Sequence, residues 1–281
     1  MDYSIASYSF HRLLEAGKQD MFKYIMDCKE FGCTLLDPWN GHLAPLIQED
    51  EGIKASTDFR QERFSPAGLD YVHRVKAAAG EAGLPFDCLA VDGAHMYELS
   101  LEARQANRAC AYRWLEVAEI LGSQKVRLDT GGTADMPDEQ FDVIVEGFND
   151  VVARAGDRGI QVVLENHWGA SNVPENVLKV IGAVDGLALL FDSGNWAAGR
   201  REAGWSMCAH LAKSVHIKAR EFDVKGNETT MDVPRVVRLL VTTGYNGCWG
   251  IESTPQDGDE YGAAQKTIAL IRRTLEDARA S

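Results

Sequence analysis

The strongest constraint on the fold of this chain is a repeated alternation of short apolar runs with amphipathic segments. Eight runs have the length and the β-branched or aromatic content of strands; they cover residues 3–10, 33–39, 85–93, 125–132, 160–167, 187–195, 214–220 and 247–254. Segments with apolar residues at helical spacing lie between them, and two of these segments stop at Gly32 and Gly122. Strands that alternate with helices predict βαβ units and therefore a parallel sheet.

Eight such units are the number that closes a (β/α)8 barrel, and a chain of 281 residues has a suitable length. A doubly wound open sheet is the alternative, but it predicts a Gly-rich phosphate loop, and neither GxGxxG nor GxxxxGK[ST] occurs. We therefore expect an α/β fold, a single TIM-barrel domain over residues 1–281. The long mixed segment at about 40–66 is interpreted as an insertion over the barrel mouth.

The charge composition of the chain disfavours two classes of binding partner. The chain has 42 acidic and 29 basic residues, a formal net charge of −13, which disfavours binding to nucleic acids and anionic membranes. No apolar run reaches the roughly 18 residues that span a bilayer, and no signal peptide is visible. The six cysteines form no CxxC pair, and we interpret them as reduced, mostly buried thiols of a cytoplasmic protein.

Four polar residues stand at the ends of successive strand-like runs in the second half of the chain. Glu165 ends "QVVLE", Asp192 ends "LALLFD", His216 lies within "SVHIKAR" and Glu252 ends "CWGIE". The carboxyl ends of barrel strands converge on one face, and the alternation of side chains along each strand places these four inward. Three carboxylates and an imidazole in a buried cavity need a counter-charge, which a divalent cation supplies.

This ligand set also indicates a chemistry. Oxygen ligands with one imidazole favour Mn²⁺, Mg²⁺ or Co²⁺, and Zn²⁺ is also compatible; we expect one ion, with Mn²⁺ preferred. A metal that binds a carbonyl and a neighbouring hydroxyl stabilises the enediolate formed when the adjacent carbon loses its proton. Glu165 and Glu252 could remove a proton from one side and return one from the other. The outcome is epimerisation or isomerisation, or elimination where a β-substituent leaves.

The motifs "LENH", "FDSGN", "VHIKAR" and "GIES", in this order, resemble the sugar phosphate isomerase/epimerase superfamily. Its members are xylose isomerase-like TIM barrels, among them ketose 3-epimerases, hydroxypyruvate isomerase and inosose dehydratase. The resemblance is clearest over residues 160–276. It implies one divalent metal, acid/base roles for the two glutamates and the ligands Glu165, Asp192, His216 and Glu252.

The resemblance further implies a small-molecule carbohydrate substrate and a homo-oligomer, since family members are commonly dimers or tetramers. One position departs from the ketose epimerases, which usually have a histidine where this chain has Asn195. Asn195 can bind a substrate hydroxyl but cannot carry a proton at neutral pH. A metal-dependent lyase or dehydratase, acting on a keto-sugar, keto-glycoside or inosose, therefore remains the alternative to an isomerase.

Further candidate contacts to substrate follow the ends of the predicted strands, where polar and aromatic side chains would line a sugar pocket. Besides Asn195 they are His167, Lys218, Arg220, His95, Trp39 and Trp168, with Trp196 and His11 as weaker candidates. Three other functions are less consistent with these residues. A nuclease needs more histidines and a basic surface, and a two-carboxylate glycosidase leaves Asp192 and His216 without a role. The third is a non-catalytic sugar-binding module.

Overall fold

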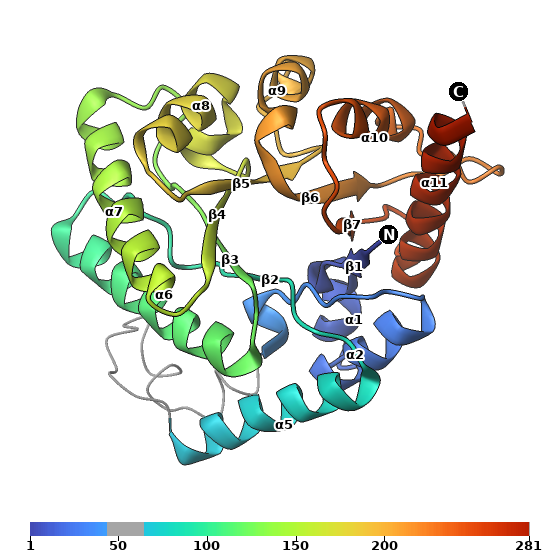
Figure 1. The fold of residues 1–281 in the computed structure, drawn as a ribbon, viewed down its shortest axis with the longest axis horizontal. Helices are drawn as coiled ribbons and strands as arrows, with labels where there is room; N and C mark the ends of the chain where they lie inside the picture. Colours follow the sequence, from blue (N-terminus) through green and yellow to red (C-terminus); the bar gives the residue numbers. More distant parts are fainter. Residues whose placement is uncertain (44–64, 281) are drawn as a thin grey trace.

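A computed structural model describes residues 1–43 and 65–280 of the chain. Seven parallel strands form one curled sheet, in the order β1-β7-β6-β5-β4-β3-β2, with helices around its outer side (Figure 1). The strands are β1 (Tyr3–Ile5), β2 (Cys88–Ala90), β3 (Lys125–Leu128), β4 (Gln161–Glu165), β5 (Ala188–Asp192), β6 (Ala212–Ala219) and β7 (Trp249–Ser253). The first strand pairs with the last, as a closing barrel requires.

The helices that cover the sheet begin and end where capping residues and glycines direct. They are α1 (His11–Glu15), α2 (Met21–Glu30), α5 (Pro66–Ala82), α6 (Leu101–Leu121), α7 (Asp138–Gly156), α8 (Pro174–Ala183), α9 (Arg201–Cys208), α10 (Val233–Thr242) and α11 (Glu260–Ala280). Asp20 caps α2 by accepting the backbone N–H of Lys23. Gly122 follows α6 with φ of 77°, the left-handed conformation that glycine adopts at low cost.

Residues 33–39, predicted as a strand, form no strand in the structure. They lie between β1 and β2 and join the two through isolated parallel bridges, Ala6 with Asp37 and Trp39 with Ala90. The segment still donates and accepts backbone hydrogen bonds on both sides, from Ser7 N–H to Asp37 O and from Ala90 N–H to Pro38 O. Pro38 has no N–H to donate, so a continuous ladder cannot form there.

The predicted strand at 3–10 also stops early, because Ser7–Phe10 turns into a 3-10 helix (η1). Ser7 and Ser9 are buried in that turn, and each binds a neighbouring chain segment: Ser7 Oγ accepts the Trp39 N–H, and Ser9 Oγ donates to Ile251 O. Most of the predicted insertion at 40–66 lies outside the described residues; Asn40–Leu43 forms a short 3-10 helix (η2).

Side-chain alternation along the strands divides the core into two clusters. Val162 and Leu164 of β4 pack in the large cluster between sheet and helices, whereas Val163 packs inside the sheet with Cys88, Ala188 and Leu190. The predicted alternation is therefore correct, and it turns Glu165, two residues after Val163, toward the interior. All six cysteines are free and buried. Within the described part of the chain, no helix is long and apolar enough to cross a membrane.

Candidate metal centre and active site

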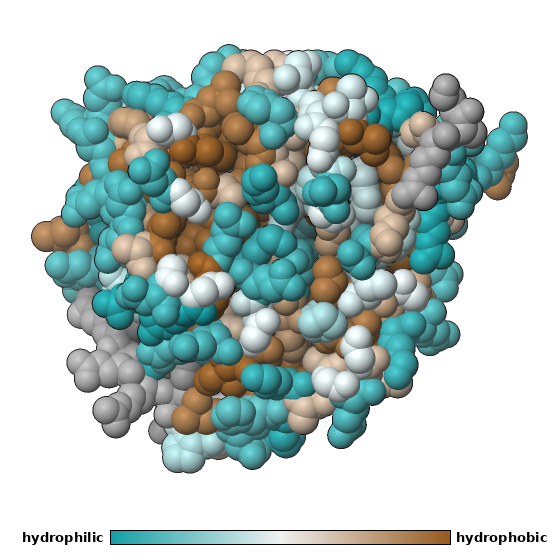
Figure 2. Space-filling model, in the orientation of Figure 1, coloured by the Kyte–Doolittle hydropathy of each residue, from teal (hydrophilic) through white to brown (hydrophobic). Residues whose placement is uncertain are grey.

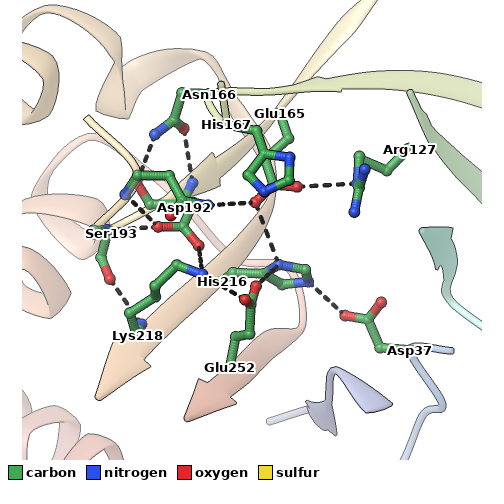
Figure 3. A network of polar contacts seen from close by, with 12 residues as sticks. Asp37, Arg127, Glu165, Asn166, His167, Asp192, Ser193, His216, Lys218 and Glu252 are labelled. Atoms are coloured by element: carbon green, nitrogen blue, oxygen red, sulfur yellow. Dashed lines mark hydrogen bonds and ion pairs between the residues drawn. The ribbon is translucent and has the colours of Figure 1, made fainter. Parts of the chain in front are cut away.

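Four buried side chains meet at the carboxyl ends of four consecutive strands, β4 to β7 (Figure 3). We call Glu165, Asp192, His216 and Glu252 the carboxylate–histidine cluster; each offers a ligand atom, and these atoms lie within 4.8 Å of one another. None of the four side chains is more than 9% exposed. Because the strands are parallel and in register, Asp192 pairs with His216 and Lys218 with Glu252 across the sheet.

Two polar atoms of the cluster are buried without a hydrogen-bond partner among the described residues. Asp192 accepts the backbone N–H groups of Gly194 and Asn195 through Oδ1, at 2.6 and 2.7 Å, which leaves Oδ2 unpartnered. His216 Nδ1 lies 2.9 Å from Glu252 Oε2 and 3.8 Å from Glu165 Oε1, yet makes no hydrogen bond. Such atoms fit a metal ion, because one carboxylate oxygen and one ring nitrogen are held toward a common point.

Asp37 orients the histidine from behind. Its Oδ2 lies 3.0 Å from His216 Nε2, and both side chains are buried. A carboxylate on Nε2 directs the other ring nitrogen, Nδ1, toward the cluster, as a ligating histidine requires. The position of Asp37 is itself fixed, because its backbone N–H donates to Tyr24 Oη at 2.8 Å.

Arg127 of β3 orients Glu165 and crosses the inner face of the sheet. Its Nε lies 3.0 Å from Glu165 Oε2, and its Nη1 lies 2.9 Å from both Asp129 Oδ2 and Asp92 Oδ1. The other oxygen of Glu165, Oε1, accepts a hydrogen bond from Asn195 Nδ2 at 3.2 Å. Glu165 is thus held at both oxygens.

Lys218 supplies the cationic side of the cluster on β6. Its ammonium group contacts Glu252 Oε1 and lies 3.4 Å from Asp192 Oδ2. The side chain is buried, and its single positive charge compensates part of the negative charge of the two carboxylates. Burial opposes this charge, but Asp192 and Glu252 outweigh burial and raise the pKa of Lys218 above its ordinary value.

The charges set different protonation states for the carboxylates. Burial alone would raise the pKa of Glu165, but Arg127 and then the nearby histidines lower it to about 2. Glu252 is also buried, and Lys218 together with His216 holds its pKa well below the ordinary value. Burial dominates at Asp192 and raises its pKa to about 6 despite Lys218. Both glutamates are therefore ionised at neutral pH, and an ionised carboxylate can accept a proton or bind a cation.

Three of the four residues of the cluster line a cavity of about 460 Å³. The predicted residues Glu165, His216 and Glu252 line it, together with the predicted substrate contacts His167, Asn195, Lys218, Arg220 and Trp39 and the weaker candidate His11. His167 Nδ1 lies 3.2 Å from Asp129 Oδ1. Burial opposes a positive charge on His167, but Glu165 and Asp129 raise its pKa to about 9.

Four predicted residues do not belong to the lining of this cavity in the described part of the chain: Asp192, which is fully buried, His95, Trp168 and Trp196. His95 is engaged by Glu98, with Nε2 2.6 Å from Oε1. Trp168 is 40% exposed, with its indole N–H on Asp129 and its ring edge-on to His95. Trp196 is 8% exposed and packs on Phe191 in the core, so its predicted role as a pocket wall is wrong.

The sequence interpretation missed three buried charged residues of the site, Asp37, Arg127 and Asp129. Each carries a signal like the one that revealed Asp192. Asp37 ends the apolar run "CTLLD", while Arg127 and Asp129 interrupt "KVRLD" two residues apart, on the same face of β3 as expected from strand alternation. A charge at an inward position of a barrel strand was therefore the common signal.

The family model of xylose isomerase-like TIM barrels matches residues 25–274. The chain belongs to this family. The predicted resemblance and the predicted barrel fold are therefore both confirmed. Among solved structures, L-ribulose 3-epimerase has a TM-score of 0.75 at 16% identity, covering 100% of this chain and 96% of its own.

The names of other similar proteins state different reactions. A 3-keto-D-glucoside 4-epimerase from E. coli has a TM-score of 0.68 at 16% identity, over 91% of this chain and 95% of its own. Inosose dehydratase of Erwinia tasmaniensis is 26% identical over 177 residues, 50% of this chain and 59% of that protein. The C-glycoside deglycosidase alpha subunit of Arthrobacter globiformis is 36% identical over 70 residues, 23% of this chain and 20% of that protein. These two alignments span less than two thirds of either relative, so neither carries its activity to this chain.

Proposed function

We propose that this protein is a divalent-metal-dependent isomerase or epimerase of a carbohydrate, which moves a proton on the carbon next to a carbonyl. The observation that carries the proposal is the carboxylate–histidine cluster, in which Asp192 Oδ2 and His216 Nδ1 are buried without a hydrogen-bond partner among the described residues. The epimerases among the structural neighbours support the same reaction class. We expect Mn²⁺ as the preferred ion, since the donor set is three carboxylates and one imidazole.

A cation held by the four residues would polarise the substrate carbonyl and favour loss of the adjacent proton. The residues of the chain do the rest. Glu165 and Glu252 come from β4 and β7, which β5 and β6 separate, so they reach the cavity from different parts of the sheet. Each is ionised and can accept a proton. Asn195 and Arg127 hold the oxygens of Glu165, which keeps that carboxylate in one orientation.

A lyase that eliminates a β-substituent is the second candidate, and His167 favours it. This imidazole lines the cavity, contacts Asp129 and has a pKa raised to about 9, so it is protonated at neutral pH. A protonated group beside the substrate can donate its proton to a departing hydroxyl or alkoxide, which elimination requires and epimerisation does not. The inosose dehydratase relative is consistent with such chemistry.

The decisive experiment combines metal analysis with hydrogen exchange. Elemental analysis of purified protein should find about one divalent metal per chain, and a screen in D₂O over ketoses, keto-acids and 3-keto-glycosides should find deuterium incorporated next to a carbonyl. Loss of water or an aglycone from the same substrate would select the lyase. Glu252→Gln should fold and lose exchange, because the amide cannot accept the proton.

The matched control is Glu175→Gln, which alters an exposed carboxylate bound to Arg200 outside the cavity. This variant should exchange at the rate of the unaltered protein. Exchange by Glu252→Gln at the unaltered rate would refute the acid/base role. The proposed function would be refuted if the purified protein bound no divalent metal and exchanged hydrogen in no substrate of the screen.

A further inference from the structure

The guanidinium groups of two arginines at the cavity have no carboxylate partner among the described residues. Arg12 of α1 and Arg220, which follows β6, both line the cavity and are both exposed. Arg12 donates through Nη1 to Pro255 O at 2.8 Å, and the guanidinium of Arg220 makes no hydrogen bond or ion pair with any described side chain. Both charges are therefore available to a ligand that enters the cavity.

The other cations of the cavity are already neutralised. Arg127 is surrounded by Glu165, Asp129 and Asp92, and Lys218 by Glu252 and Asp192. The carboxylates around these two inner cations outnumber them, so neither Arg127 nor Lys218 carries uncompensated positive charge. Arg12 and Arg220 add positive charge that the described residues lining the cavity do not compensate by contact, on a protein whose net charge is −13.

The backbone holds the two arginines beside one loop. The loop after β7 contains Pro255, whose carbonyl accepts from Arg12, and Gln256, whose N–H donates to Arg220 O at 3.2 Å. The N–H of Arg220 donates to the buried carboxylate of Glu228 at 3.2 Å. The main chain at Arg220 is thus fixed while its side chain is free, and both arginines flank Gln256, which also lines the cavity.

Figure 2 shows hydrophilic residues gathered over the centre of the face drawn, above the strands of Figure 1. A neutral sugar can be bound by neutral hydrogen-bonding groups alone. A guanidinium matches the geometry of a carboxylate or phosphate group, to which it can donate two parallel hydrogen bonds. Two such groups that line one cavity, each attached to the same loop, therefore favour an anionic group on the ligand.

We propose that the substrate is an anionic carbohydrate, whose carboxylate or phosphate group is held by Arg12 and Arg220 while its carbonyl end reaches the carboxylate–histidine cluster. This inference rests on the proposed function for the reaction, but the anion subsite can be tested separately. The two arginines would bind an anionic oxygen group of the substrate, which can be either a carboxylate or a phosphate ester.

Binding is measured by calorimetry on the purified protein with three ketoses that differ at one carbon: D-fructose, D-fructuronate and D-fructose 6-phosphate. We expect at least one of the two anions to bind roughly 10–100-fold more tightly than fructose, as a charged hydrogen-bonded pair contributes. Arg220→Gln and Arg12→Gln should each remove most of that preference, so that the Kd of the anion approaches the Kd of fructose for the same variant. Whichever anion binds more tightly identifies the source.

The control is Arg238→Gln, which removes the same charge from an exposed position on α10 outside the cavity. It should keep the preference, and Arg220→Lys should keep part of it. The proposal is overturned if both anions bind no more tightly than fructose, or if Arg220→Gln and Arg238→Gln weaken anion binding equally. An arginine-dependent preference in a protein that exchanges no substrate would support the subsite and refute the proposed reaction.

Discussion

Replacing Arg127 by methionine tests whether this guanidinium holds the charged residues of the site together. The Arg127 side chain is 6% exposed, and the substitution leaves Glu165 and Asp129, both at most 4% exposed, without their cation. Asp92 is 44% exposed, so water can replace its contact. Breaking a buried ion pair by removing one partner costs about 3–5 kcal/mol. A typical domain has a free energy of unfolding of about 5–15 kcal/mol, so the loss should be large.

Denaturant unfolding at several pH values measures this loss and its cause. The pKa of Glu165 is lowered from 4.5 to about 2, so the stability that its ionised form gains from Arg127 is present above pH 4.5 and lost as the pH falls through about 2. The difference between Arg127→Met and the unaltered protein should therefore be largest near neutral pH and should shrink in acid.

The control is Arg74→Met, which removes an arginine paired with Asp70 on the surface of α5. Both partners are more than half exposed, and such a pair contributes roughly 0.2–1 kcal/mol. If Arg127→Met lost no more stability than Arg74→Met, or if its loss were independent of pH, the assignment of Arg127 as the counter-charge of Glu165 would be wrong.

Three further predictions concern the metal centre. Asp37→Asn should weaken Mn²⁺ binding about 10–100-fold in calorimetry, because His216 loses the carboxylate that orients it. The control Asp87→Asn breaks a buried pair with Lys125 outside the cavity and should leave Mn²⁺ binding unchanged. A chelator should lower the melting temperature; at a metal concentration 100 times the Kd, the ion adds about 2.7 kcal/mol. Asn195→Ala should reduce the exchange rate yet cost only about 0.5–1.5 kcal/mol of stability, since one hydrogen bond is lost; an unchanged rate would contradict its role.

The second half of the barrel could be predicted from the sequence because its signals are local. Along β4 the apolar residues of "QVVLE" continue to a single charge, so the strand, its end and the inward direction of Glu165 all follow from one pattern. Asp192 follows from the same pattern at β5. Parallel register then brings the strand ends together, which needs no knowledge of the loops.

The first half was less predictable because its structure depends on distant contacts. Residues 33–39 have the apolar content of a strand, but Pro38 interrupts the hydrogen-bond ladder, and the segment is placed by its neighbours β1 and β2. Trp196 follows a strand end as Trp39 does, yet one indole packs in the core and the other lines the cavity. Nothing in the local sequence distinguishes these two environments. Arg127 was missed because an arginine in an apolar run can equally be exposed.

The isolated bridges at residues 33–39 have a consequence for how such a protein can change over evolutionary time. The four cluster residues all lie on β4 to β7, which continuous ladders hold together. The ring is joined between β1 and β2 by a few bridges instead. Insertions and replacements beside these bridges disturb few hydrogen bonds, so descendants can acquire new loops there while the carboxylate–histidine cluster stays intact.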